Sequence, residues 1–298
     1  MRVEYREEPC KAALNHVKGM PFAWSLNPYM GCAHRCTFCY VRAFEQRADR
    51  PSGDDYGRSI RVKVNVAEVL RGELARKTWQ RDHVAIGAAT DPYQPAEGRY
   101  KLTRACLEAL RDARNPFHLI TRSPMVVRDL DVLVEAASRA ELSITFSIPT
   151  LDEEVWRRTE PGTPPPGQRL RAVRELVDAG IRAGVGIAPV LPGISDRPEQ
   201  LRAVVEAARE AGATGIWANV LYLKAGTREH FLRELARDWP EHAERYEQLY
   251  ARRAYLPASE IAHVKKLVAR FRDEIEPSRK RPRLLRPEPE PEQLSLAV

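Results

Sequence analysis

Mostly apolar short runs alternate with longer amphipathic stretches through the middle of the chain. The apolar runs predict buried strands, and they read HVAIGAAT (83–90), HLITRS (118–123), LSITFSIPT (142–150), RAGVGIAPVL (182–191) and GIWANVLYL (215–223). The stretches between them carry helix start and end signals, and they predict helices over Thr103–Ala113, from Ser123–Pro124, over Gln168–Gly180 and over Pro198–Gly212. The pattern therefore predicts repeated β-α units.

A further short strand is predicted over Ala23–Asn27, before these runs. About six successive β-α units predict an α/β protein with a parallel sheet, arranged as a partial (β/α)6 TIM-like barrel. A flat doubly wound sheet is the alternative architecture. No glycine-rich dinucleotide or phosphate fingerprint follows any predicted strand, and this absence favours the barrel.

The segments before the repeated units have a weaker pattern. Residues 1–21 predict an irregular N-terminal lead-in, and residues 45–58 predict a polar, flexible connection. Apolar residues then alternate with charged residues over 60–64, which predicts a half-exposed strand. Asn65 followed by Glu68 matches a capping box, so a helix is expected to begin there.

These patterns divide the chain into four segments. The lead-in is followed by the barrel over 22–225, a helical C-terminal extension over 226–275, and a tail over 276–298. The tail is rich in proline and in blocks of charge, so we expect it to be disordered. Its RKRPR run is either a solvated segment or a contact for nucleic acid.

Composition narrows the class of protein. In the 298 residues, 43% are hydrophobic, which is enough for a large core. No apolar run is long enough to span a membrane, and the first residues lack the apolar segment of a secretory signal. Five cysteines do not make a disulfide framework in a chain of this length, so a reducing, cytoplasmic location is expected. A net charge of +7 permits an anionic partner such as nucleic acid.

The stretch MGCAHRCTFCY gathers three of the five cysteines, Cys32, Cys36 and Cys39, in the spacing C-x3-C-x2-C. Thiolates at this spacing suit zinc or an iron-sulfur cluster. A structural zinc site requires a fourth ligand, which would have to be His34 or one of the remaining cysteines. A [4Fe-4S] cluster held by three cysteines instead leaves one iron open to a small molecule.

This motif, with Phe38 at its penultimate position, resembles the signature of radical S-adenosylmethionine (SAM) enzymes. The resemblance covers about residues 20–225, and in that family the motif follows the first strand of a partial barrel. It implies that the three cysteines hold a [4Fe-4S] cluster whose open iron binds SAM. An external one-electron reductant of the flavodoxin or ferredoxin type would reduce the cluster. Cleavage of SAM then gives a 5′-deoxyadenosyl radical that abstracts a substrate hydrogen.

The active site of such a barrel lies at the carboxyl ends of its strands. Thr90 and Asp91 follow the second strand, and the resemblance implies that they face the SAM amino group, although Asp91-Pro92 is also a turn signal. Arg122 follows the third strand and is either a solvated cation or a partner of the SAM carboxylate.

Polar residues also follow the later strands. Ser147 either fills the barrel or bonds SAM, and Asn219 is a candidate SAM or substrate contact. Glu160 and Arg169 are candidate supporting residues. Phe38, Thr90, Asp91, Arg122, Ser147 and Asn219 are thus the predicted cofactor-binding residues.

The strings TDPYQP, TRS and RDLD resemble the spore photoproduct lyase-like branch, which is often described as DNA repair photolyase-like. The resemblance implies a nucleic acid or nucleotide substrate. Spore photoproduct lyases have a hydrogen-returning cysteine after the second strand, whereas this chain has Ala88, Ala89 and Thr90 there. Tyr93 is the predicted catalytic hydrogen relay, with Tyr40 as the alternative.

Two other functions remain open from the sequence. One is a radical SAM enzyme that acts on a peptide or small metabolite. The other is a non-catalytic iron-sulfur or zinc protein that binds nucleic acid.

Overall fold

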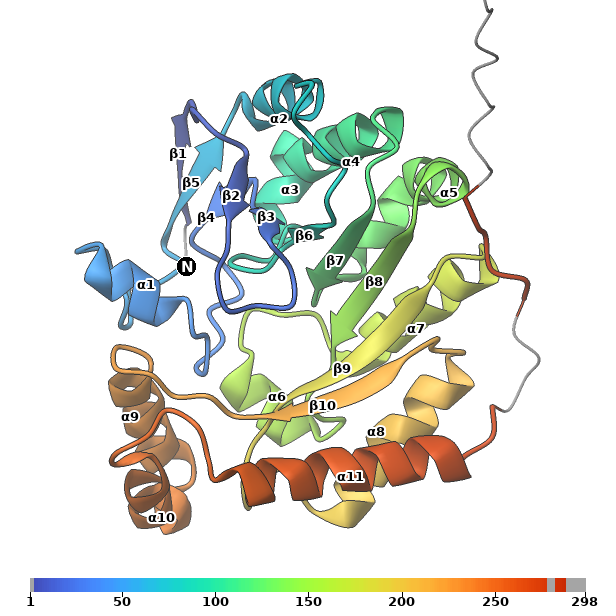
Figure 1. Ribbon diagram of the computed structural model, residues 1–298. Coiled ribbons are helices and arrows are strands. Elements are labelled where there is room, and N and C mark those ends of the chain that lie inside the picture. The colour runs from blue at the N-terminus through green and yellow to red at the C-terminus, as the bar shows by residue number, and fades with distance from the viewer. Residues whose placement is uncertain (1–2, 278–281, 288–298) are drawn as a thin grey trace, which may run out of the picture.

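A computed structural model describes residues 3–277 and 282–287. Its central feature is a seven-stranded sheet in the order β10-β9-β8-β7-β6-β3-β2 (Figure 1). All of these strands except β2 (Leu14–His16) run parallel to their neighbours. The parallel strands are β3 (Trp24–Leu26), β6 (Val84–Ile86), β7 (Phe117–Thr121), β8 (Leu142–Ser147), β9 (Ala183–Val190) and β10 (Ile216–Val220).

The parallel strands lie side by side in chain order, so the sheet is wound in one direction. A doubly wound sheet would reverse its strand order at a switch point, and the described residues contain no such reversal in this sheet. β10 and β2 lie at opposite ends of the sheet and do not pair, so the barrel is open. The predicted α/β fold with a partial barrel is therefore confirmed.

Helices cover one face of the curved sheet (Figure 1). The larger ones are α2 (Val66–Leu74), α4 (Leu102–Asp112), α5 (Leu130–Arg139), α7 (Pro166–Asp178) and α8 (Pro198–Glu210). Strand residues such as Leu119, Ile144 and Val185 are buried in the main hydrophobic core with these helices. Short helical segments α3 (Pro95–Tyr100), η1 (Pro124–Asp129) and α6 (Glu153–Thr159) follow three of the strands.

Two predicted helix starts have different outcomes. Ser123 is the N-cap of η1 and its hydroxyl accepts a hydrogen bond from the backbone N–H of Met125. Asn65 precedes α2, but its side chain makes no capping bond. Instead, its amide group exchanges two hydrogen bonds with the backbone of Cys10, at 2.7 and 3.1 Å. The Asn65 side chain therefore makes a tertiary contact in place of the helix cap that the local sequence pattern predicts.

The N-terminal segments are more ordered than their sequence predicts. A second sheet contains β1 (Glu4–Glu8), β5 (Ser59–Lys63) and β4 (Tyr29–Met30). β1 lies at the edge of this sheet with a largely exposed, charged sequence, so it has no apolar alternation to reveal it. Helix α1 (Arg42–Arg47) follows the cysteines. The prediction of a flexible connection over 45–58 is wrong at Tyr56, which is 1% exposed.

The C-terminal extension is helical, as predicted, with α9 (Arg228–Asp238), α10 (Pro240–Tyr250) and α11 (Ala258–Glu274). α11 packs against β10 and α8. Within the predicted disordered tail, residues 282–287 lie against the body, where the N–H of Leu285 donates to the carbonyl of Gly180 at 2.8 Å. Positions 278–281 and 288–298 lie outside the described residues. Among those described, no helix is long and apolar enough to cross a membrane.

Candidate functional site

The three clustered cysteines line one cavity, which we call the cysteine cavity. Its walls come from the cysteine loop (residues 30–41), from the segment that follows β6, from the end of β7 with the next residue, and from Tyr56. The lining residues are Cys32, Arg35, Cys36, Cys39, Tyr40, Val41, Tyr56, Gly87, Ala88, Ala89, Thr90, Asp91, Ile120, Thr121 and Arg122. The cavity therefore joins the cysteines to the carboxyl ends of two barrel strands.

The remaining cysteines of the chain do not line this cavity. Cys106 is buried on α4 in the main core, as predicted, and Cys10 packs against the same core. Burial raises the pKa of the Cys36 and Cys39 thiols above the ordinary value, so binding a metal centre there must release protons. Three thiols that face one cavity, without a fourth cysteine in its wall, fit a three-cysteine iron-sulfur cluster better than structural zinc.

His34 does not line this cavity, although its ring lies close to the Cys32 thiol as well as to Asp91. Its ring is buried, and Nδ1 lies 3.3 Å from Oδ2 of Asp91 without hydrogen-bond geometry. Asp91 also accepts hydrogen bonds from the backbone N–H groups of Tyr93 and Arg122 and from the Thr121 hydroxyl. Burial opposes the charge on Asp91, but His34, the Thr121 hydroxyl and the N–H of Arg122 hold the pKa of its carboxyl at about 2. The carboxylate is therefore ionised at neutral pH.

The turn predicted at Asp91-Pro92 is present, since Oδ1 of Asp91 accepts from the N–H of Tyr93 at 2.9 Å. Thr90 is adjacent and buried, and its hydroxyl donates to the carbonyl of Tyr29 at 3.0 Å. Both residues line the cysteine cavity. Their contact with SAM stays a prediction.

Arg122 reaches the cavity from the end of β7, and its position is fixed by a series of ion pairs. Its Nε donates to Oε1 of Glu160 at 2.6 Å, and its guanidinium lies 5.6 Å from the centre of the Phe38 ring. Burial acts to lower the pKa of Arg122, but Cys36 and Glu160 raise that pKa, so it remains a cation. Glu160 in turn pairs with Arg169, whose side chain is fully buried. The structure thus brings both predicted supporting residues to Arg122.

Four of the predicted residues, Phe38, Ser147, Asn219 and Tyr93, do not line the cavity. Ser147 ends β8, and its carbonyl accepts from Arg169 at 2.8 Å, whereas Asn219 is half-buried on β10. Tyr93 is fully buried, and its hydroxyl donates to Oδ2 of Asp129 at 2.9 Å. The turn at Asp91 directs Tyr93 into the core, away from the cysteine cavity, and its predicted role as a hydrogen relay stays a prediction. Tyr40 lines the cavity, and its hydroxyl donates to the carbonyl of Ala88.

Sequence reasoning missed three residues that build the site. Asn27 accepts hydrogen bonds from the N–H groups of Ala89 and Thr90, which fixes the segment after β6. Tyr56 lines the cavity and Arg42 packs on its ring, and both come from segments with no recognisable motif. These residues differ from ordinary polar loop residues only in being buried in the folded protein, and burial of this kind cannot be read from the sequence.

Comparisons with known proteins agree with this geometry. The family model described as Radical SAM superfamily matches residues 26–205. An uncharacterised protein of Mycobacterium tuberculosis is 40% identical over 260 residues, which cover 86% of this chain and 76% of the relative. A "Radical SAM Nalpha-GlyT isomerase" of Pseudomonas phage M6 is 29% identical over 169 residues, covering 56% of this chain and 33% of that protein.

Solved structures show the same fold. A variant of spore photoproduct lyase superposes with a TM-score of 0.69 and 14% identity, covering 92% of this chain and 80% of that chain. Another variant, with bound AdoMet and dinucleoside spore photoproduct, gives a TM-score of 0.67 at 15% identity and covers 91% and 79%. At these identities the likeness concerns the fold.

Proposed function

This chain belongs to the radical SAM superfamily, and we propose that Cys32, Cys36 and Cys39 hold the [4Fe-4S] cluster that this family uses with SAM. The chain is therefore an enzyme, and the non-catalytic alternative is set aside. When bound and reduced, cluster and SAM together supply a 5′-deoxyadenosyl radical that takes a hydrogen atom from the substrate. An external carrier of the flavodoxin or ferredoxin type is the proposed reductant.

The observation that carries this proposal is the shared cavity. Three thiols face the same space as Arg122 and Asp91, at the carboxyl ends of β6 and β7. A cation and an anion side by side match the carboxylate and ammonium groups of a bound amino acid. Arg122 is proposed to pair with the SAM carboxylate, while Asp91 and Thr90 face the amino group. Phe38 orients Arg122 through its ring face.

Ser147 and Asn219 lie on strands whose carboxyl ends open toward the same end of the barrel. We propose that they contact the parts of SAM or substrate that extend beyond the cysteine cavity. Tyr40, which lines the cavity, takes the place of Tyr93 as the proposed hydrogen relay. No cysteine is present over Ala88–Thr90 to fill that role.

The proposed substrate is a nucleic acid or nucleotide. Support comes from the net charge of +7 and the sequence pI near 9.2, which suit a polyanionic partner. The fold is also that of a lyase whose structure holds a dinucleoside photoproduct. A peptide or small metabolite is the second candidate substrate, and the test below distinguishes a peptide from a nucleic acid.

The test is anaerobic reconstitution with iron and sulfide, followed by reduction, addition of SAM and chromatography for 5′-deoxyadenosine. Formation of 5′-deoxyadenosine together with about four irons per chain supports radical initiation. Deuterated oligonucleotides and deuterated peptides are then offered in parallel. Transfer of deuterium from oligonucleotides alone supports the nucleic acid proposal, whereas transfer from peptides alone overturns it. A reconstituted cluster that never cleaves SAM overturns the radical function.

A further inference from the structure

A loop that sequence patterns predict to be flexible is packed behind the cysteines. The bracing loop, residues 52–57, is tied to the cysteine loop by Arg42, which is 1% exposed. The Arg42 guanidinium donates to the carbonyls of Ser52 and Gly53, at 2.8 and 2.7 Å, and to the carbonyl of Cys36 at 3.2 Å. One buried side chain therefore fixes the separation of the two loops.

Backbone contacts close the same junction. Gly57 has φ of +77°, and a Cβ atom there would overlap the carbonyl oxygen of Cys32. Arg35 donates from its guanidinium to the carbonyls of Tyr56 and Asp54, at 3.1 and 2.7 Å. The bracing loop thus approaches the cysteine loop as closely as a backbone without a side chain allows.

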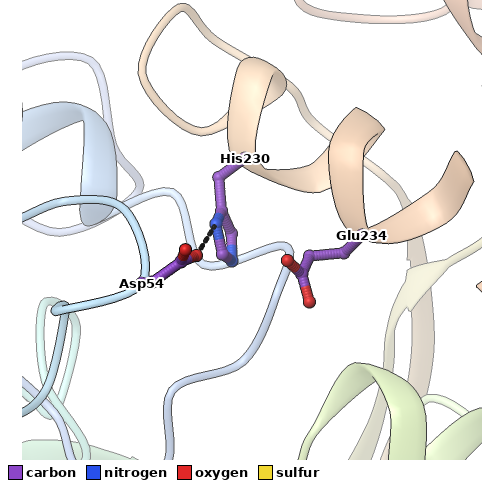
Figure 2. A group of neighbouring side chains, drawn as sticks. All are labelled: Asp54, His230 and Glu234. Carbon is purple, nitrogen blue, oxygen red and sulfur yellow. Dashed lines mark ion pairs between the residues drawn. The ribbon is translucent and has the colours of Figure 1, made fainter. Parts of the chain in front are cut away.

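The far side of the bracing loop is anchored to α9. Figure 2 shows Asp54 from this loop beside His230 and Glu234, which project from α9. Oδ1 of Asp54 lies 3.6 Å from Nδ1 of His230 and 2.5 Å from Nη2 of Arg233. Although these three side chains could hold a metal ion, Arg233 already pairs with Asp54 and Arg237 pairs with Glu234 at 2.9 Å. The group is therefore an anchor for the loop.

This framework holds Tyr56 against a cysteine. The Tyr56 ring lies 4.5 Å from the Arg42 guanidinium, and only 1% of the residue is exposed. Its hydroxyl oxygen is 3.5 Å from Sγ of Cys39, within hydrogen-bond distance for sulfur. A thiolate has no proton to give, so the hydroxyl is the donor whenever Cys39 is deprotonated.

We propose that Tyr56 is a positioning residue for the cluster, and that its hydroxyl donates a hydrogen bond to the Cys39 thiolate and raises the cluster's reduction potential. This inference rests on the proposed ligation by Cys39. A donor to a ligating sulfur stabilises the more negative, reduced cluster more than the oxidised one, which makes reduction easier. Tyr56 is only 1% exposed, so its hydroxyl has little contact with bulk water and the bond acts in a partly buried environment.

The test is a redox titration of the reconstituted protein, monitored by electron paramagnetic resonance of the reduced cluster. Tyr56→Phe removes the donor and keeps the ring. We expect the equilibrium to shift about tenfold toward the oxidised cluster, a potential about 59 mV more negative for one electron. Incorporation of 3-fluorotyrosine in place of Tyr56 makes a stronger donor, and the potential is expected to move in the opposite direction. Tyr250→Phe is the control, because that buried hydroxyl donates to the carbonyl of Leu221.

Opposite shifts in the two Tyr56 variants, with the iron content unchanged, support the inference. If Tyr56→Phe loses iron, the test rests on the fluorinated protein, which keeps both the ring and the hydroxyl. Its reduction potential is then compared with that of the parent. Potentials equal to that of the parent in every iron-loaded Tyr56 variant overturn it. Failure of the parent itself to hold a cluster would instead count against the proposed function, so the two failures are distinguishable.

Discussion

The Nε of Arg122 donates a hydrogen bond of 2.6 Å to Oε1 of Glu160, and the side chain of this carboxylate is 1% exposed. Because Glu160 also pairs with the buried Arg169, its position is fixed from two sides. Arg122 therefore presents its charge to the cysteine cavity from a supported position. This arrangement is what pre-organised binding of a carboxylate requires.

Replacing Arg122 by alanine is expected to weaken SAM binding about tenfold to a hundredfold, because a hydrogen bond to a charged group is worth roughly 1.5–3 kcal/mol. The iron content should stay that of the parent. Equilibrium dialysis with labelled SAM measures the affinity. The control is Arg111→Ala, whose side chain is equally accessible, at 21%, but pairs with surface carboxylates. SAM affinity unchanged in Arg122→Ala would remove this residue from the site.

Arg169→Leu is expected to lower the free energy of unfolding by about 3–5 kcal/mol. The physical reason is that the substitution removes one partner from a buried ion pair and leaves Glu160 only partly compensated. Urea unfolding followed by circular dichroism gives the measurement. A decrease in the free energy of unfolding below about 1 kcal/mol would show that Arg122 alone is sufficient to compensate the charge of Glu160.

The Cys36→Ala variant should lose the cluster and all cleavage of SAM, because two thiolates remain to hold it. Iron and sulfide analysis together with the visible spectrum provides the measurement. Cys106→Ala is the matched control, since this thiol lies in the core on α4 and does not line the cysteine cavity. Full cluster content in Cys36→Ala, or its loss in Cys106→Ala, would contradict the ligand assignment.

Gly57→Ala is expected to reduce iron incorporation and to destabilise the fold by about 1–3 kcal/mol. The new Cβ atom would collide with the carbonyl of Cys32, and the positive φ is costly for alanine. Gly53→Ala in the same loop serves as the control, because nothing lies within 4 Å of the position that its new methyl group would take. Iron per chain and the urea midpoint are compared. Equal behaviour of the two variants would argue against close contact between the loops.

Stability should fall as pH decreases from about 6.5 to about 4, in part through His230. Burial, Arg42 and Arg233 lower the pKa of His230 to about 4 from its ordinary 6.5. Between these values the unfolded chain binds a proton that the folded chain does not, so unfolding is favoured as pH drops. The contribution is at most about 3.5 kcal/mol, at about 1.4 kcal/mol per pKa unit.

The measurement is a series of urea unfolding curves across this pH range, for the parent and for His230→Gln. We expect the variant to show a shallower dependence on pH, whatever its stability at neutral pH. Parallel curves would indicate that His230 titrates normally in the folded protein.

The sequence by itself determined the order of β-α units and the identity of the cysteine motif. Strands such as Phe117–Thr121 and Leu142–Ser147 follow from apolar runs, because a parallel strand covered by helices must be apolar over several residues. The C-x3-C-x2-C motif is local, so its spacing alone indicates a three-thiolate site. Arg122 and Asp91 could also be identified from the sequence, because polar residues that follow parallel strands gather at one edge of the sheet.

Only the tertiary structure decided which other side chains meet these residues. The sequence predicts Tyr93 as the hydrogen relay with Tyr40 as the alternative, but the turn at Asp91 buries the first and the cysteine loop places the second at the cavity. Tyr56 comes from a segment whose polar composition predicts a flexible loop, and its burial depends on Arg42 and on Gly57. Contacts between segments that are distant in the chain produce no pattern in the sequence. Only the folded structure shows which of these side chains lie close together.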